Sequence, residues 1–208
     1  MDDELLDVFD ERGWHVGVKP RADVHRDGDW HQAFHLWVVN ADGVLLQRRA
    51  RDKASWPGYL DASAAGHLIA GEAVRDGLRE AEEELGAAYA FDDLESLGMH
   101  RVDDAERSGV VNRELQHVFA VRDARPLETW RDFDRVELDG LVLVGHDGFL
   151  ELARALEAGT DRGEDLAVPA RAWDGVAVVD ARVTPGELVP APYLSTIAPA
   201  LRRLGRRR

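Results

Sequence analysis

The stretch that decides the fold is GHLIAGEAVRDGLREAEEELG, which spans residues 66–86. Its second half is rich in Ala, Leu, Arg and Glu, which are good helix formers, and no β-branched residue follows Val74. This composition predicts a helix that ends at Gly86 in a left-handed cap. One stripe of the predicted helix is apolar and consists of Leu78, Ala81 and Leu85.

Acidic residues crowd a second face of this helix. Because residues three and four apart are neighbours on a helix, Glu80, Glu83 and Glu84 project together. Asp76 lies one turn earlier, whereas Glu82 points to water. The carboxylates repel one another unless a cation lies among them, and oxygen ligands suit a hard cation such as Mg²⁺ or Mn²⁺. Taken alone, a run of glutamates is more often a solvated acidic face.

The whole stretch resembles the Nudix box. That pattern is a glycine, five residues, a glutamate, seven residues, Arg-Glu, an apolar residue, any residue, Glu-Glu, any residue, a glycine and an apolar residue. Its charged and glycine positions are filled by Gly66, Glu72, Arg79, Glu80, Glu83, Glu84 and Gly86. The chain departs from the pattern twice, because only residues 73–78 separate Glu72 from Arg79 and the small Ala87 fills the last position. The shortening precedes the helix, so it weakens the candidacy of Glu72 alone.

The resemblance implies a hydrolase that cleaves a pyrophosphate bond in a nucleoside diphosphate-type substrate by attack of water on phosphorus. Bound Mg²⁺ or Mn²⁺ would neutralise the phosphates and activate the water. The implied metal ligands are Glu80, Glu83, Glu84 and Glu114. The implied catalytic residues are Arg79, Glu83, Glu84 and Glu114. Arg79 can reach Glu83 one helical turn later and orient its carboxylate.

Substrate contacts are expected from outside the helix. The candidate substrate-binding residues are Arg48, Arg49, Gly66, His67 and Gly71. Arg48 and Arg49 alternate across a predicted strand, so at most one of them points into the site. Gly66 and Gly71 flank the loop that must pass close to the metal.

Within this superfamily, residues 25–85 look closest to the branch that includes type 1 isopentenyl-diphosphate isomerase and its hydrolase relatives. The segments that carry the likeness are 31–34, 45–50, 53–58, 66–68 and 112–114. The isomerase needs a cysteine just before its Gly-His-like turn to transfer a proton. This chain has Ala64 and Ala65 there and no cysteine at any position, so we rank isomerase activity below hydrolysis.

The same isomerase holds a metal on several histidines and a glutamate. His25, His31, His67 and Glu114 fall near those positions, and Asn112 stands where a second acid is expected. On sequence alone we interpret His25 and His31 as surface histidines. A third alternative is a Nudix-fold binding module without catalysis, which loss of glutamates from the box would mark, and none is lost here.

The composition is that of a soluble globular protein, because 45% of the 208 residues are hydrophobic and 32% are charged. The sequence has no membrane-spanning run and no secretory signal, and its lack of cysteine fits a cytoplasmic protein. The net charge of −14 opposes binding to nucleic acid polymers. We expect a small nucleotide or diphosphate as the partner and also consider a homodimer. The basic tail is interpreted as a solvated end and consists of Arg202, Arg203, Arg206, Arg207 and Arg208.

Alternation and turn signals predict a mixed α/β fold. Strands are expected at residues 5–9, 15–19, 32–40, 44–48, 61–68, 94–102, 109–121, 135–144 and 176–183, with later helices at 149–157 and 194–204 and a loop-rich bridge at 158–173. The Nudix resemblance implies an α/β/α sandwich with a mixed sheet. We expect a Nudix domain over residues 1–160, which includes the N-terminal strand pair, and a C-terminal extension over residues 161–208.

Overall fold

The computed structural model describes residues 4–105, 111–159 and 166–207. The strands are β1 (Leu5–Phe9), β2 (His15–Pro20), β3 (Trp30–Val39), β4 (Val44–Arg49), β5 (Leu60–Asp61), β6 (Ala64–His67), β7 (Glu95–Ala105), β8 (Val111–Arg122), β9 (Leu138–Val144), β10 (Val168–Trp173) and β11 (Val178–Val183). The α-helices are α1 (Arg21–Asp27), α2 (Arg79–Leu85), α3 (His146–Glu157) and α4 (Leu194–Gly205). Short 3₁₀ helices include η1 (Val74–Leu78) and η5 (Pro185–Glu187).

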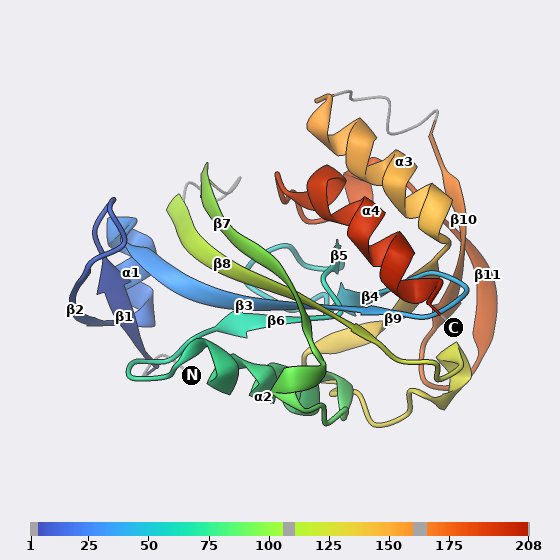
Figure 1. Cartoon of the computed structure of the whole chain (residues 1–208), viewed down its shortest axis with the longest axis horizontal. Helices are drawn as coiled ribbons and strands as arrows, with labels where there is room; N and C mark the ends of the chain where they lie inside the picture. Colours follow the sequence, from blue (N-terminus) through green and yellow to red (C-terminus); the bar gives the residue numbers. More distant parts are fainter. Residues whose placement is uncertain (1–3, 106–110, 160–165, 208) are drawn as a thin grey trace.

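All eleven described strands belong to one mixed sheet. Its main path runs β11-β10-β9-β4-β3-β1-β2, while β5 pairs with β4, β6 and β8 pair with β3, and β7 pairs with β8. The β3–β8 pair is parallel and its neighbours are antiparallel. Helices α3 and α4 cover one face and α2 covers the other (Figure 1). This arrangement confirms the expected α/β/α sandwich with a mixed sheet.

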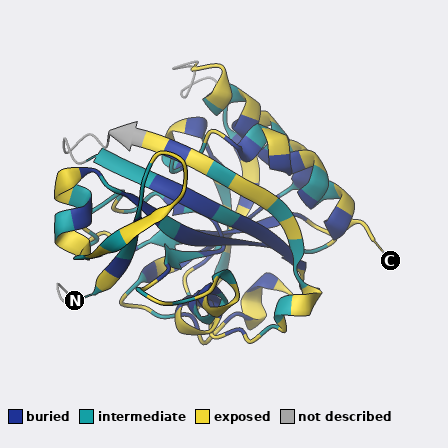
Figure 2. Ribbon diagram, turned by 60° about the vertical axis from the view of Figure 1, so that its left-hand side comes forward, coloured by how far each residue is buried: buried dark blue, intermediate teal, exposed yellow. Residues whose placement is uncertain are grey.

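Strand β3 supplies side chains to both cores of the sandwich because alternate residues of a strand point to opposite faces. Trp37 and Val39 pack in the core that includes α3 and α4. Phe34, Leu36 and Val38 pack in the core that includes α2. Buried residues accordingly run along the central strands, while the outer helix surfaces are exposed (Figure 2).

The sheet divides beside β3, and this division makes room for the site. Strand β4 pairs with β3 only at Val38 and Val39, whereas β6 pairs with residues 33–36. Ser63 joins the diverging strands, because its Oγ accepts a hydrogen bond from Val38 N–H at 2.7 Å and donates one to Leu45 O at 2.5 Å. The edge of β6 that faces away from β3 is therefore available to side chains of α2.

Two expectations from the sequence are wrong. The single strand expected at 61–68 is two short strands, β5 and β6, separated at Ala62 and Ser63. The loop expected at 158–173 contains β10, although residues 160–165 lie outside the described part. Pro169 makes this strand hard to predict from the sequence, because proline has no N–H to donate to a neighbouring strand. The structure tolerates it because pairing with β9 begins one residue later, at Ala170.

The basic tail was expected to be a solvated end, but the structure places some of its arginines in ion pairs. Arg202 lies in α4, and its guanidinium contacts Asp147 at 2.9 Å. Arg207 contacts Glu95 at 2.8 Å. These exposed ion pairs contribute little energy individually, but they join the tail to α3 and β7. Arg208 lies outside the described residues.

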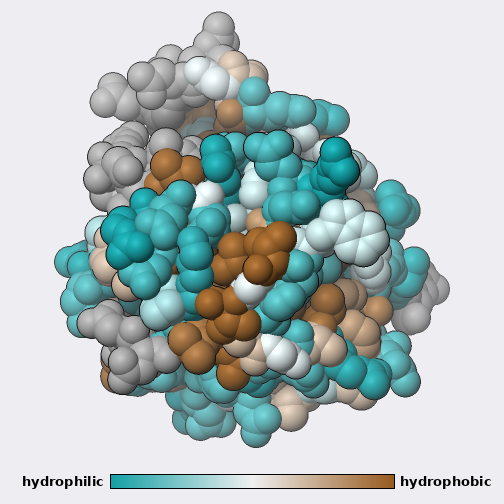
Figure 3. Space-filling view, turned by 90° about the vertical axis from the view of Figure 1, so that its left-hand side faces the viewer, coloured by the Kyte–Doolittle hydropathy of each residue, from teal (hydrophilic) through white to brown (hydrophobic). Residues whose placement is uncertain are grey.

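The N-terminal hairpin of β1 and β2 forms one end of the sheet. Seen from that end, apolar surface gathers over the hairpin (Figure 3), where Leu5, Val16 and Val18 are exposed. The opposite face of β1 is buried through Leu6 and Val8. Among the described residues, no helix has the length and apolarity needed to cross a membrane. The homodimer and the domain boundary at residue 160 stay predictions.

Packing of η1 on β3 gives the first testable prediction. A Cβ added at Gly77 would lie 2.6 Å from Leu68 Cδ2 and 2.7 Å from Phe34 Cβ. We expect Gly77→Ala to destabilise the protein by about 1–3 kcal/mol through overpacking. In a chain of this size that lowers Tm by about 2–4 °C per kcal/mol, measured by calorimetry. Gly186→Ala in η5 is the matched control, because no heavy atom lies within 4 Å of its added Cβ. Equal shifts in the two variants would contradict this packing.

Candidate functional site

The acidic helix begins as a 3₁₀ turn. Residues 74–78 form η1, and α2 continues directly from Arg79 to Leu85. Asp76 stabilises the start because its carboxylate accepts a hydrogen bond from Ala73 N–H at 2.9 Å. Gly86 ends α2 in the left-handed region at φ 62°, which confirms the expected cap. Ala81 and Leu85 are fully buried in the α2 core, as the apolar stripe predicted.

Strand β6 runs so close to α2 that it determines the position of two glutamates. A Cβ added at Gly66 would lie 2.1 Å from Glu80 Oε1, so any larger residue would push the Glu80 carboxyl group out of this position. Next to it, Ala65 N–H donates a hydrogen bond to Glu84 Oε2 at 2.9 Å. From β4, Gln47 Nε2 donates to the same oxygen at 3.2 Å. Both glutamates are less than one tenth exposed.

This burial changes the protonation of both carboxyl groups. Burial raises the pKa of Glu80 to about 7, although the charge of Arg79 opposes the shift. Burial raises the pKa of Glu84 to about 8, although the Ala65 hydrogen bond and the charge of Arg49 oppose it. Near neutral pH the two groups are therefore partly protonated in the metal-free protein. A bound cation would stabilise their ionised forms.

Arg79 organises the rest of the acidic cluster. Its Nε donates to Glu72 Oε1 at 2.9 Å, and its Nη1 donates to Glu80 Oε1 at 2.5 Å and to Glu83 Oε2 at 3.0 Å. The predicted reach from Arg79 to Glu83 is confirmed. Its Nη2 also donates to the carbonyl of His67 at 3.0 Å, which ties α2 to β6. Glu72 orients Arg79 and accepts a hydrogen bond from Ile69 N–H at 2.9 Å.

Helix geometry predicted that Glu80, Glu83 and Glu84 project together, but in the structure their side chains lie in different environments. Glu80 and Glu84 are buried against β6, whereas the side chain of Glu83 is 58% exposed at the edge of the cluster. Glu82 is exposed as expected. A cation beside Glu80 and Glu84 would therefore be partly enclosed, with Glu83 on its solvent side.

The expected substrate-binding residues are placed differently from one another. The charge of Arg49 acts on Glu84, and its guanidinium is held by the carbonyl of Ser55 at 3.2 Å. Arg48 points elsewhere, because it donates to Gly58 O at 3.1 Å and contacts Glu187 at 3.5 Å. Phosphate binding by Arg49 stays a prediction.

Two further positions complete this comparison. Lys53 was not singled out from the sequence, yet its charge also acts on Glu84, and its ammonium group contacts Glu137. No local pattern around Lys53 indicates this contact, because Glu137 lies more than eighty positions later in the sequence. Gly71 lies in an exposed turn at φ 86°, where its N–H donates to Asp7 Oδ2 at 2.9 Å. Its expected role near the metal stays a prediction.

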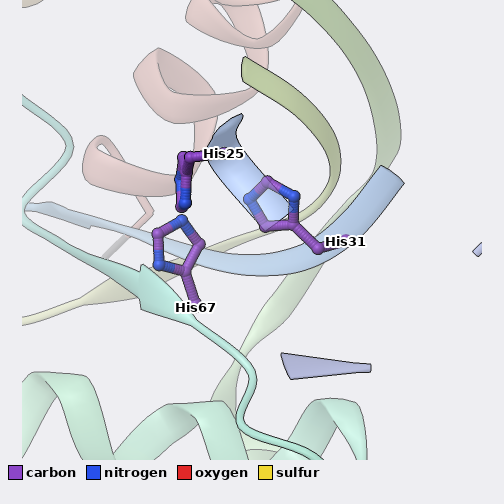
Figure 4. Close-up of side chains that lie close together, drawn as sticks. All are labelled: His25, His31 and His67. Carbon is purple, nitrogen blue, oxygen red and sulfur yellow. The ribbon is translucent and has the colours of Figure 1, made fainter. Parts of the chain in front are cut away.

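A second cluster lies on the other side of β6. His25 from α1, His31 from β3 and His67 from β6 converge (Figure 4). One nitrogen of each ring lies within 4.8 Å of one nitrogen of each of the others. The ring centroids are 4.9 to 5.1 Å apart. Three imidazoles at this spacing can bind one divalent transition metal ion.

Backbone hydrogen bonds select which nitrogens face the centre of this cluster. The Nδ1–H of His25 donates to Arg21 O at 2.8 Å, and that of His31 donates to Asp29 O at 3.0 Å. Each Nε2 is then a bare acceptor. His31 Nε2 is buried without a hydrogen-bond partner. It faces Glu114 Oε1 at 3.7 Å, so two electron-pair donors approach each other with no proton between them. A cation resolves that arrangement.

The titration of these groups suits metal binding. Burial lowers the pKa of His67 to about 4, although Glu114 at 3.3 Å opposes the shift. Burial also lowers the pKa of His25. Burial alone would raise the pKa of Glu114, but the neighbouring imidazoles of His31 and His67 hold it well below its usual range. Neutral imidazoles and an ionised carboxylate are the forms that coordinate metals.

The structure corrects the interpretation of the two histidines and places Glu114 beside them. His31 is fully buried and His25 is half-buried, so they are not surface histidines. Glu114 does not join the helix glutamates but lies among the histidines, opposite His31 in the β3–β8 ladder. The β3 register explains both results, because His31 and Glu114 are direct parallel neighbours on the face away from α2.

Next to the histidine cluster, the C-terminal segment closes over the sheet. Tyr193 is fully buried and its hydroxyl lies 2.7 Å from His35 Nδ1. Its ring stacks on His100 of β7 with centroids 4.7 Å apart. Sequence reasoning missed these residues because they lie on three segments that only the folded sheet brings together.

The geometry of the site agrees with the comparisons to known proteins. The model of the NUDIX domain family matches residues 29–159. An uncharacterised Nudix hydrolase of Clostridium acetobutylicum is 35% identical over 161 residues, which cover 76% of each chain. An isopentenyl-diphosphate Delta-isomerase of Clavibacter michiganensis subsp. michiganensis is 37% identical over 134 residues, which cover 60% of this chain and 66% of the isomerase.

A solved structure supports the fold alone. The crystal structure of a Deinococcus radiodurans protein superposes with a TM-score of 0.55 at 24% identity, over 73% of this chain and 90% of the other. Nudix hydrolases act on pyrophosphate bonds and generally use divalent metals. Since the family model covers more than half of the chain and the clostridial relative matches three quarters of it, the chain is a member of the Nudix hydrolase family.

Proposed function

We propose that the chain is a Mg²⁺- or Mn²⁺-dependent hydrolase that cleaves a pyrophosphate bond in a nucleoside diphosphate-type substrate. Water attacks one phosphorus of the bond. The observation that carries the proposal is the burial of Glu80 and Glu84 against β6, beside the cationic Arg49. Two buried carboxyl groups whose charges repel each other are costly in the absence of a cation, so their presence points to metal binding.

Each residue of the site has a defined task in this proposal. Glu80, Glu83 and Glu84 would hold a divalent ion on the α2 side, and His25, His31, His67 and Glu114 would hold one on the other side of β6. When bound, such ions neutralise phosphate charge and lower the pKa of water. Arg79 fixes the orientation of Glu80 and Glu83 through its hydrogen bonds. Arg49 and Lys53 provide positive charge for substrate phosphates.

The second candidate function is isopentenyl-diphosphate isomerisation. The three-histidine cluster and the isomerase relatives favour it. The segment beside the cluster opposes it, because Ala65, opposite His35 in the β3–β6 ladder, cannot donate or accept a proton. A non-catalytic binding module is opposed by the retention of every box glutamate. The substrate's nucleoside part and the cytoplasmic location remain part of the proposal.

One experiment separates hydrolysis from isomerisation. We expect a panel of nucleotide diphosphates to include one that is cleaved only when Mg²⁺ or Mn²⁺ is added back after chelation. In H₂¹⁸O, the label should enter a phosphate product, because water is the nucleophile. Isopentenyl diphosphate should acquire no deuterium from heavy water, since the side chains of Ala64 and Ala65 can neither donate nor accept a proton. Deuterium exchange without any nucleotide cleavage would reverse the ranking, and full turnover in chelator would remove the metal assignment.

The buried carboxylate of Glu84 gives a matched pair of variants. Glu84→Gln keeps the shape but removes the charge, and we expect kcat to fall roughly 10²-fold or more. The metal-free variant should melt at the same temperature as the wild type or higher. At pH 7 the unfolded chain ionises Glu84, whereas burial keeps it largely neutral when folded, and this difference opposes folding. Glu82→Gln is the exposed control and should change neither quantity. Equal kinetic losses would refute the assignment of the helix faces.

Metal affinity should depend on pH with a defined sign. The pKa values of about 7 for Glu80 and about 8 for Glu84 lie above their ordinary value of 4.5. Protons therefore compete with the metal below pH 7, and both carboxyls are ionised above pH 8. We expect calorimetry to show tighter Mn²⁺ binding as pH rises from 6 to about 8.5, with protons released to the buffer. An affinity independent of pH over this range would contradict binding at these groups.

A further inference from the structure

Each of two buried glutamates in the site is held by a buried glutamine. Gln47 is fully buried, and its Nε2 donates to Glu84 Oε2 at 3.2 Å. Gln116 is 6% exposed, and its Nε2 donates to Glu114 Oε2 at 2.5 Å. The two pairs lie on opposite faces of the sheet, one toward α2 and the other toward the histidine cluster. The same local arrangement therefore occurs at both candidate metal positions.

The amide oxygens of these glutamines lack donors. Gln47 Oε1 and Gln116 Oε1 are both buried with no hydrogen-bond partner among the described residues. Buried acceptors are rarely left in this state, because they have lost water without gaining a replacement. Rotating the Gln116 amide would not help, since it would place an amide oxygen against an ionised carboxylate. The oxygen and nitrogen of an amide are bonded to the same carbon. The unpaired Oε1 of each glutamine is therefore close to the glutamate that its Nε2 contacts.

The missing partner must supply hydrogen-bond donors beside a carboxylate that binds a cation. A bare metal ion cannot do this, but Mg²⁺ and Mn²⁺ retain several water ligands, and each bound water presents O–H donors. His31 Nε2 is a third buried atom without a hydrogen-bond partner among the described residues, and it lies 3.7 Å from an oxygen of Glu114, the carboxyl group to which Gln116 donates. A hydrated divalent ion at each centre would supply donors to the two amide oxygens and a direct ligand bond to His31 Nε2.

We propose that Gln47 and Gln116 are matched positioning residues. Each donates its N–H to one oxygen of a metal-binding carboxylate and accepts, through Oε1, a hydrogen bond from a water on the metal. Gln47 serves the ion beside Glu84, and Gln116 serves the ion beside Glu114. This inference rests on the proposed function, because it assumes that the two centres hold divalent ions. Neither glutamine is part of the Nudix box.

The test is a titration of the metal-free protein with Mn²⁺, followed by calorimetry. Gln47→Met and Gln116→Met keep the side-chain length but remove both the donor and the acceptor. We expect each variant to weaken one binding event by about 10–100-fold, which is typical for groups that orient metal ligands. The Gln47 event should be the one that Glu84→Gln removes, and the Gln116 event the one that His31→Ala removes. Gln32→Met, at the third glutamine of the chain, is the control and should bind Mn²⁺ as the wild type does.

Thermal melting of the metal-free variants reports the structural part of each substitution. Each variant loses an acceptor without a donor, but it also loses the N–H that the buried carboxylate accepts, so a lower metal-free Tm fits either role and only the loss of Mn²⁺ affinity is specific to positioning. A lower metal-free Tm together with wild-type Mn²⁺ affinity would overturn the inference.

The outcomes also distinguish this inference from the proposed function. Cleavage of nucleotide diphosphates with unchanged Mn²⁺ binding in both variants would overturn the inference alone. Weakened Mn²⁺ binding in an enzyme that cleaves no diphosphate would overturn the function and support the inference. A wild-type protein that binds no Mn²⁺ would overturn both.

Discussion

The close approach of β6 to α2 is the constraint on which both halves of the site depend. Gly66 leaves no space between its backbone and Glu80, and the neighbouring Ala65 N–H holds Glu84. One residue further, the ring of His67 joins the histidine cluster, while its carbonyl accepts a hydrogen bond from Arg79. Two centres on opposite faces of a sheet thus share three consecutive residues. A displacement of this strand would disturb both at once.

The short segment between Glu72 and Arg79 still allows α2 to keep its position. The segment before Arg79 is one residue shorter than the Nudix pattern, yet Glu72 still reaches Arg79 at 2.9 Å. The residues in between form η1, and a 3₁₀ helix rises about 2.0 Å per residue compared with about 1.5 Å in an α-helix. Fewer residues therefore span a similar distance. The cost is packing so tight that Gly77 has no space for a Cβ.

Features set by local spacing could be predicted from the sequence, and features set by strand register could not. The cap at Gly86, the buried stripe and the Arg79–Glu83 pair follow from helical geometry within eight residues. The histidine cluster needs segments from α1, β3 and β6, so periodicity alone did not bring His25 and His31 together, and only the isomerase resemblance grouped them. The place of Glu114 depends on the parallel β3–β8 pairing, which connects residues more than eighty positions apart and leaves no periodic signal.

The larger core has a consequence for how the chain is made. The family match ends at residue 159, but Ile197, Leu201 and Leu204 of α4 belong to the same core as Trp37 of β3. During synthesis, α3 can cover only part of this face of the sheet until α4 has left the ribosome. The nascent chain therefore holds a wide apolar surface for most of its translation, when it is most open to aggregation and to chaperones. Strand β3, which carries His31, is therefore synthesised early but is fully covered only when α4 packs on it.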